Sequence, residues 1–474
     1  MKKLLIGFLA VGLVMGFAMT ASAQPNIKAS GQLYMYGAYE DKPTLVKNGD
    51  SHTNIGNRLR MQFEIQVQEG LKLTTRFDAL ERAWGEVPAV TTAAPSTTTT
   101  NYRRYENNIS WERAYVTFNA LYGVFDVGYQ QSRVWGTCAF CDDYDTDAGI
   151  HYRYMMGPWT FGLEWEKRAG TNNNLFIGLP VEGQGEGASQ GRANDLGGTD
   201  NDHDVYHAYA IYRWATGQAG LRFEMDRDAA NGEIAANQTT LANYFGGAAE
   251  SYTYTFYEIA PYLQWIAGPF SLEAEFRYIW GTIDRVTLVD IDRKGWSLYL
   301  NPKYTMGAFY GGLEFAYITG DDPTTSDKLE AGVPGGQAWD PLLMFGNYWM
   351  TKYHGAMGST PTVGAVGGAA TTIGPYEANL IMVKPYVGWK VNPQLEVVAQ
   401  FAWLKADEKP ATNWVDDDYG REFDIYATYK LYNNLSYTVG FGYFWTGDYF
   451  KGTNASPINV EDNFLVMNAL NLAF

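Results

Sequence analysis

The only two cysteines of the chain lie beside a group of aspartates, and together these residue types could form a disulfide or hold a metal ion or a haem. The cysteines are Cys138 and Cys141, and the aspartates that follow them are Asp142, Asp143, Asp145 and Asp147. A c-type haem attachment needs a histidine directly after the second cysteine, where this chain has Asp142. Two cysteines are too few for a structural zinc site, and no helix is predicted that would activate a thiol. In an exported chain, an intraloop disulfide between Cys138 and Cys141 is the favoured interpretation.

The alternate spacing of the aspartates is also found at the start of calcium-binding loops. Such a loop needs glycine where this chain has Ala148, and it needs a later glutamate that is missing here. The histidines have no recognisable catalytic motif around them, although the members of a Ser/His/Asp triad need not be close in sequence. They are His52, His151, His203, His207 and His354. We expect no resident metal, no cofactor and no enzymatic activity.

The segments that would position these residues have the periodicity of β-strands. In residues 54–69, apolar side chains such as Ile55, Leu59 and Phe63 alternate with polar ones such as Arg58 and Arg60. A helix, with its period of 3.6 residues, would mix the two sets, so the alternation predicts a strand. Residues 71–79 resume the pattern after a tight turn at residues 69–70. The two segments therefore predict a β-hairpin.

The hairpin pattern recurs along the whole chain. Short turns are predicted at residues 69–70, 120–123, 157–158, 216–217, 267–269, 306–308, 392–393 and 433–434. Longer polar stretches lie at residues 40–53, 85–108, 134–147, 170–203, 229–251, 282–292, 321–375, 407–420 and 448–459. Eight turns and nine stretches separate eighteen strands, the first near residues 27–39. Sixteen is the alternative, because residues 151–156 and 252–266, which include Pro261, give the weakest strand patterns.

The composition favours a membrane-spanning β-barrel over a soluble enzyme. Residues 1–23 have the charged start, apolar centre and Ala-Ser-Ala end of a secretory signal peptide, which leaves residues 24–474 as a single barrel domain. Removing Lys2 and Lys3 with this segment leaves 33 basic and 52 acidic residues, a formal charge of −19, which argues against nucleic acid as a partner. No further run of eighteen apolar residues predicts a transmembrane helix. Aromatic residues, at 16%, and 51 glycines suit a barrel with aromatic girdles and tight turns.

If the apolar faces of the strands meet lipid, the opposite faces must line a lumen. Many ionised residues then point inward, and they need water because an unpaired charge in a dry core is costly. An eighteen-stranded barrel is wide enough to hold a channel. The basic candidates for the channel wall are Arg58, Arg60, Arg76, Arg113, Arg153, Arg213 and Arg222.

The final residues add a resemblance to a known family. Phe464, Val466, Leu470, Leu472 and the terminal Phe474 form an apolar stripe at a spacing of two, interrupted by Asn468. This stripe resembles the closing strand of bacterial outer-membrane β-barrels, and the resemblance implies that Phe474 is an assembly signal. It also implies an all-β fold, a transmembrane antiparallel β-barrel with short periplasmic turns and long extracellular loops.

The layout further resembles that of general porins. In that family the third loop folds into the barrel and forms a charged constriction opposite an arginine cluster, and residues 124–136 look like the strand that leads into it. The resemblance implies that Asp142, Asp143, Asp145 and Asp147 face Arg58, Arg60, Arg76 and Arg113 across the pore. Solvated surfaces that never meet are the alternative. The third loop here is shorter than that of the family, so residues 170–203 or 321–375 could supply the constriction instead. Residues 339–350 are rich in large apolar side chains and could form a lid or meet a neighbouring subunit.

These features predict a porin in the bacterial outer membrane that lets ions and small polar solutes diffuse through a water-filled channel. A substrate-specific channel is one alternative, and a barrel scaffold around a partner such as a cytochrome is another. The expected partners are outer-membrane lipid, lipopolysaccharide and small polar solutes, with a homotrimer as a candidate assembly.

Overall fold

The protein is described by a computed structural model. The structure describes residues 25–43, 45–84, 109–131, 135–137, 139–140, 146–169, 203–229, 252–285, 289–336, 339–346 and 379–474. The expected signal peptide and large parts of several predicted loops lie outside these residues. No helix within them is long and apolar enough to cross a membrane.

The described residues form strands of alternating direction with one short 3₁₀ helix. The strands are β1 (Asn26–Asp41), β2 (His52–Gln68), β3 (Leu71–Ala83), β4 (Ile109–Ala120), β5 (Gly123–Gln131), β6 (Thr146–Met156), β7 (Trp159–Ala169), β8 (His203–Trp214), β9 (Gly217–Asp228), β10 (Tyr252–Ala267), β11 (Phe270–Arg285), β12 (Ile291–Met306), β13 (Phe309–Ile318), β14 (Lys328–Leu329), β15 (Leu380–Lys390), β16 (Leu395–Lys405), β17 (Asp418–Tyr432), β18 (Leu435–Thr446) and β19 (Asn463–Ala473). The 3₁₀ helix η2 (Asp448–Lys451) lies between β18 and β19.

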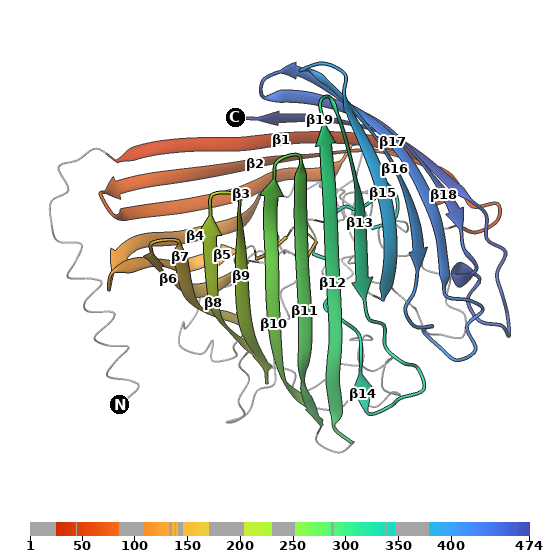
Figure 1. The fold of residues 1–474 in the computed structure, drawn as a ribbon, viewed down its shortest axis with the longest axis horizontal. Helices are drawn as coiled ribbons and strands as arrows, with labels where there is room; N and C mark the ends of the chain where they lie inside the picture. Colours follow the sequence, from red (N-terminus) through yellow and green to blue (C-terminus); the bar gives the residue numbers. More distant parts are fainter. Residues whose placement is uncertain are drawn as a thin grey trace, which may run out of the picture.

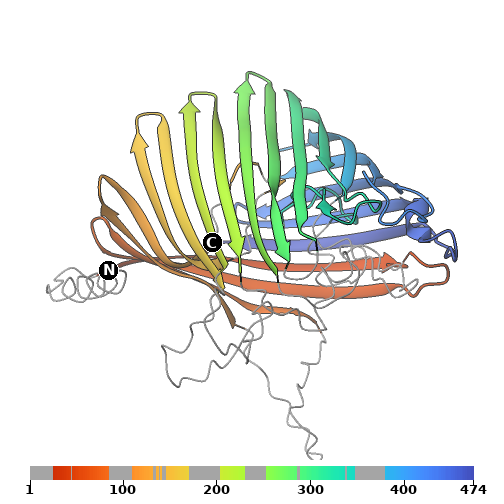
Figure 2. The ribbon, with the colours of Figure 1, turned by 90° about the horizontal axis from the view of Figure 1, so that it is seen from below.

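Eighteen of these strands form a closed antiparallel β-barrel. Each strand pairs with its neighbours in sequence order, and β13 pairs directly with β15 because β14 is a two-residue parallel addition to β12. β1 and β19 pair over ten residues, from Gln32 opposite Ala473 to Asp41 opposite Phe464, and this pairing closes the ring. Figure 2 shows the strands following one another around the ring until the blue C-terminal strands return to the red β1. The all-β barrel and the count of eighteen, rather than sixteen, are confirmed.

The eight predicted short turns fall between the observed strand ends. β1 begins and β19 ends at the rim that carries the turn between β2 and β3 (Figure 1). Leu121 and Tyr122, between β4 and β5, have positive φ angles of 50° and 64°, as a two-residue hairpin turn of type I′ requires. The two segments with weak strand patterns became β6 and β10. Pro261 sits inside β10 opposite Leu221 of β9, and the register with β11 is the same on either side of it.

The two faces of the barrel wall differ in character. On the outside, apolar residues are exposed, with Trp111 and Leu163 each 60% accessible. On the inside, residues one position away along the strands are buried and frequently charged, as at Arg58 and Asp78. This is the separation that the pleat of a strand imposes when one face meets hydrocarbon.

The seam between the first and last strands is tightly packed at Gly31. Gly31 and Phe474 exchange two backbone hydrogen bonds of 2.7 and 3.0 Å. A Cβ atom at Gly31 would lie 2.7 Å from the Phe474 ring and 2.8 Å from the carbonyl oxygen of Arg60. The aromatic ring could turn aside, but the backbone oxygen could not.

We therefore expect Gly31→Ala to destabilise the barrel by about 1–3 kcal/mol, the usual cost of overpacking. Urea unfolding of the refolded protein, followed by tryptophan fluorescence, would measure the change in the free energy of unfolding. Gly311→Ala is the matched control, because a Cβ there would meet only the Tyr386 carbonyl oxygen, at 3.3 Å. Equal stability of the two variants would contradict the packing argument.

Candidate channel lumen

The first basic group of the inner wall lies on β2 and β3 and is bound to an acidic partner from the same wall. Arg60 donates from Nε and Nη2 to the two carboxylate oxygens of Asp78, both at 2.7 Å. Arg58 Nη1 lies 3.7 Å from Asp78 Oδ2. Arg58 and Asp78 are 4% and 2% exposed, so the group is almost fully covered. The geometry makes Asp78 the local counter-ion of both arginines.

A second basic group lies on β3 and β4. Arg76 and Arg113 stand opposite each other in the strand register, and a bulge follows between Arg76 and Phe77. Arg76 Nη2 lies 3.6 Å from Glu112 Oε2. The bulge brings Glu112 onto the lumenal side, where strict alternation would have turned it to lipid.

The other basic candidates are spread over the following strands. Arg153 Nη2 on β6 donates to Asp126 Oδ2 on β5 at 2.6 Å. Arg213 Nη1 on β8 donates to Thr160 Oγ1 on β7 at 2.7 Å. Arg222 Nη2 on β9 lies 3.1 Å from Glu258 Oε1 on β10. Each of the three joins neighbouring strands.

Among the predicted acidic candidates, the structure describes Asp147. Its Oδ2 atom lies 3.3 Å from Arg168 Nε on β7, so its partner belongs to the adjacent strand. Asp142, Asp143 and Asp145, with the disulfide candidates Cys138 and Cys141, lie outside the described residues. The expected contact between these aspartates and the arginines of β2–β4 therefore stays a prediction.

A belt of charged residues crosses the inner wall from β6 to β11. We call it the transverse belt, and its members are Asp147, His151, Glu164, Glu166, Arg168, His203, His207, Arg222, Glu224, Asp226, Glu258, Glu275 and Arg277. Arg222 Nη2 lies 2.9 Å from Glu224 Oε2 and 3.1 Å from Glu258 Oε1. The sequence indicated the inward direction of Arg222, but the histidines were set aside for lack of a motif.

Part of the third loop enters the barrel and packs against β8–β11. We call residues 135–137 and 139–140 the first inserted segment. The Trp135 ring, 2% exposed, lies between the rings of Tyr209 and Tyr262, with centroid distances of 5.4 and 5.1 Å. Its Nε1 donates to the Ala260 carbonyl oxygen at 2.9 Å. The polar edge of the indole is thus satisfied inside the barrel.

Two members of the transverse belt hold the rest of this segment. Thr137 donates from its backbone N and its Oγ1 to Glu275 Oε2, at 2.6 and 2.9 Å. Arg277 Nη2 donates to the Phe140 carbonyl oxygen at 3.0 Å, and its guanidinium lies 5.6 Å from the Phe140 ring centroid. The inward fold of a third loop, which the porin resemblance implied, is present in the described part of that loop.

A second inserted segment, residues 339–346, lies against β13 and β15–β18. Trp339 Nε1 donates to Glu314 Oε1 on β13 at 2.8 Å. Lys384 Nζ on β15 donates to the Pro341 carbonyl oxygen at 2.5 Å and lies 2.8 Å from Glu314 Oε2. The sequence left two outcomes open for this apolar stretch, a lid or a contact with a neighbouring subunit. Its described part lies inside the barrel.

Two carboxylates of β17 accept hydrogen bonds from the backbone of the second inserted segment. Met344 N and Phe345 N donate to the two oxygens of Glu422, at 2.8 and 2.9 Å. Leu343 N donates to Asp424 Oδ2 at 3.1 Å. Glu422 and Asp424 are fully buried. Their oxygens accept hydrogen bonds from backbone N–H groups that are shielded from water. Buried N–H groups need such acceptors within the protein.

The two inserted segments belong to one packed mass. Gly336 N, just before the second segment, donates to the Ala139 carbonyl oxygen of the first at 2.9 Å. Phe140, Trp339 and Met344 share one buried apolar cluster with wall residues such as Tyr36 and Tyr419. The described parts of the two segments thus fill the interior beside β8–β13, β15–β19 and β1, where they contact both apolar and charged wall residues.

Trp135→Ala should loosen the first inserted segment and raise the single-channel conductance, because the indole is its largest anchor on the wall. Planar-bilayer recordings of the wild-type and variant barrels would measure this change. Trp403→Ala is the matched control, since Trp403 is 47% exposed on the outside of β16. An unchanged conductance in Trp135→Ala would show that the segment does not narrow the channel.

Comparison with known proteins gives a likeness of fold. No family model and no curated protein matches the sequence. Among solved structures, OpdQ of Pseudomonas aeruginosa is 13% identical with a TM-score of 0.48, and the match covers 94% of this chain and 98% of that one. The outer membrane channel DcaP of Acinetobacter baumannii is 12% identical with a TM-score of 0.41, covering 96% and 99%. An anion-selective porin from Comamonas acidovorans is 12% identical with a TM-score of 0.41, covering 95% and 100%.

The fold assignment rests on the chain's own strands. Their closed pairing leaves no sheet edge among the ring strands, and many of their outward side chains, such as Trp111, Leu163 and Trp403, are exposed and apolar. Such a cylinder satisfies its backbone within a bilayer, as outer-membrane barrels do. By its architecture the chain is a closed antiparallel β-barrel of the membrane-spanning type.

Proposed function

We propose that the barrel is a passive channel for ions and small polar solutes, with its water-filled path along the charged half of the lumen. The supporting observation is the partial hydration of ion pairs on the inner wall. Lys72 and Glu64, 3.7 Å apart, have side chains 29% and 33% exposed. Arg153 and Asp126 have side chains 31% and 13% exposed. Charged groups on the inner face that keep contact with water mark where a polar solute can pass.

The inserted segments define the other side of this path. Their described residues bury apolar side chains against β8, β10, β12, β13, β15–β19 and β1, and the path would run between them and the ionised walls of β2–β7. Selection would then depend on pore radius and wall charge, with no chemical step. A partner threaded through the barrel would have to displace these segments from their wall contacts. This favours a solute channel over a scaffold for a cytochrome.

Liposome swelling with a graded series of sugars, amino acids and organic acids tests the proposal. A general channel gives rates that fall smoothly with solute size, whereas a substrate-specific channel gives a selected solute a rate above that trend. Liposomes that fail to swell in every solute, together with bilayers that carry no current, would contradict the channel.

We also propose that three copies assemble through the outer face of β6–β9. This face has an apolar groove of about 600 Å³, and its lining includes Tyr152, Phe161, Leu163, Leu221 and Phe223. Light scattering of the barrel in detergent should then give three times the mass of one chain, after subtraction of the detergent. A mass of one chain would contradict the trimer and leave the channel proposal intact.

Wall charge should set the ion preference. Arg153→Gln removes a hydrated positive charge next to Asp126 and should shift the channel towards cations, because Asp126 would lose its counter-ion. The reversal potential in a salt gradient measures this preference. Arg421→Gln makes the same charge change on the exposed outer side of β17, so it should leave the reversal potential unchanged. Equal reversal potentials for Arg153→Gln and the wild type would place Arg153 outside the ion path.

A further inference from the structure

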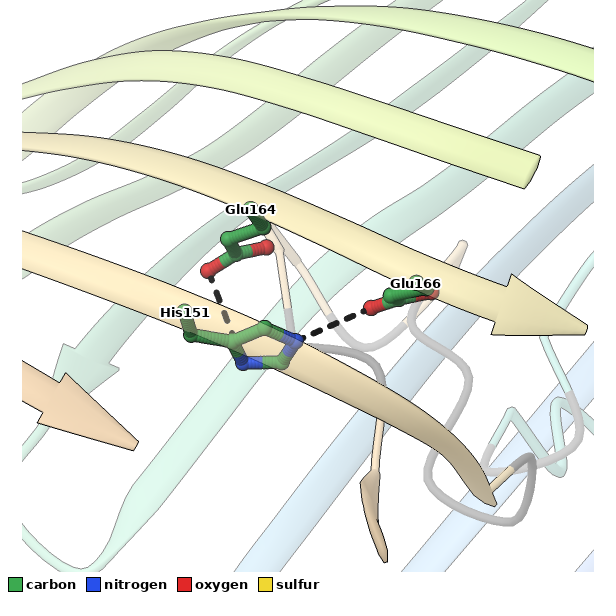
Figure 3. A group of neighbouring side chains, drawn as sticks. All are labelled: His151, Glu164 and Glu166. Atoms are coloured by element: carbon green, nitrogen blue, oxygen red, sulfur yellow. Dashed lines mark ion pairs between the residues drawn. The ribbon is translucent and has the colours of Figure 1, made fainter. Parts of the chain in front are cut away.

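Within the transverse belt, one histidine and two glutamates from neighbouring strands converge inside the barrel. His151 comes from β6, and Glu164 and Glu166 come from β7 (Figure 3). One ligand atom of each residue lies within 4.8 Å of those of the other two. His151 is 5% exposed and Glu166 is 1% exposed, so the group is enclosed. All three are donor types that bind divalent transition metals.

The distances are close to those of a metal centre. A tetrahedral zinc ion about 2.0–2.1 Å from its donors holds them roughly 3.3 Å apart. His151 Nε2 lies 3.3 Å from Glu166 Oε1. His207 adds a second imidazole, with its Nδ1 3.4 Å from Glu164 Oε2. A side-chain rotation that moves the Glu164 carboxylate by about 1 Å or more would bring its oxygen to the distance that a shared metal ion requires.

The imidazoles themselves require an extra positive charge. A neutral imidazole carries one N–H, yet both ring nitrogens of His207 face carboxylates, Nε2 at 3.0 Å from Glu224 and Nδ1 at 3.4 Å from Glu164. His151 is placed in the same way, with Nδ1 4.0 Å from Glu164 and Nε2 3.3 Å from Glu166. Neither His151 Nε2 nor His207 Nδ1 makes a hydrogen bond, although both are buried. A proton or a metal ion must separate each nitrogen from its carboxylate.

The surrounding charges favour a cation as well. Seven carboxylates of the transverse belt face three guanidinium groups: Asp147, Glu164, Glu166, Glu224, Asp226, Glu258 and Glu275 against Arg168, Arg222 and Arg277. Even with His151, His203 and His207 protonated, the belt keeps an excess of negative charge. With the three histidines neutral, the belt carries an excess of four negative charges, and a bound dication would reduce this excess to two.

The contacts of His207 also resemble the support that metal-bound histidines receive. Its Nε2 lies 3.0 Å from Glu224 Oε2, and Glu224 is paired with Arg222. A carboxylate at one ring nitrogen fixes the tautomer and directs the lone pair of the other nitrogen towards the metal. Here that other nitrogen is Nδ1, which faces Glu164.

We propose that the inner wall binds one divalent transition-metal ion of the zinc class through His151, Glu164 and Glu166, with His207 as a further donor. The ion would join β6 to β7 and reduce the negative charge of the lumen at that level. Because binding needs a deprotonated imidazole, protons compete with the metal ion for the histidine nitrogens.

Titration of the full-length barrel with Zn²⁺ tests the proposal. Protein refolded in detergent and stripped with EDTA should take up one Zn²⁺ per chain in isothermal titration calorimetry, more weakly at pH 5.5 than at pH 7.5. His151→Gln and Glu166→Gln should each weaken binding at least about tenfold, since even outer-shell changes cost that much. Co²⁺ should give visible absorption with the wild type and lose it with His151→Gln.

The controls separate the site from general surface binding. His52→Gln removes an exposed histidine of β2 and should bind Zn²⁺ as the wild type does. Glutamine has nearly the shape of glutamate, so Glu166→Gln should keep the heat-modifiable gel mobility of a folded barrel. A wild type that takes up no Zn²⁺, or folded His151→Gln and Glu166→Gln variants that bind it unchanged, would overturn the site. Neither result would bear on the channel proposal, which liposome swelling and conductance test separately.

Discussion

The structure depends on one constraint, the requirement that every backbone N–H and C=O of a membrane-spanning segment find a partner within the protein. The chain meets it by pairing β1 with β19, so that each strand of the ring has two neighbours. Once the ring is closed, the pleat leaves each side chain only two directions. Apolar residues such as Trp111 face the hydrocarbon, and ionised ones such as Arg58 and Asp78 face the interior.

The interior then poses the opposite problem, because a wide ring must be filled by water or by protein. This chain uses both. The inserted segments carry Trp135 and Trp339 to the wall, and carboxylates such as Glu275 and Glu422 bind the backbone N–H groups that come with them. Carboxylates suit this task because one of them can accept several hydrogen bonds. On the remaining wall, pairs such as Arg60–Asp78 balance charge between adjacent strands.

The fold could be predicted from the sequence because period-two alternation is local and repeats through nearly every hairpin. It identified β2 from residues 54–69 and the closing strand from residues 464–474, and it gave the inward direction of Arg58 and Arg60. The partners of the wall arginines could not be predicted. Asp78 comes close to Arg58 and Arg60 only through strand register, and Glu112 comes close to Arg76 only through a bulge. The histidines of the transverse belt were missed for the same reason. His151 meets Glu164 across β6 and β7, and no spacing along the chain records that contact.

The hydrogen bond between Gly336 and Ala139 links two loops that are about two hundred residues apart in sequence and anchored on different strands of the wall. The inserted segments of the same two loops also share one buried apolar cluster, so moving either of them off the wall would expose side chains of the other to water.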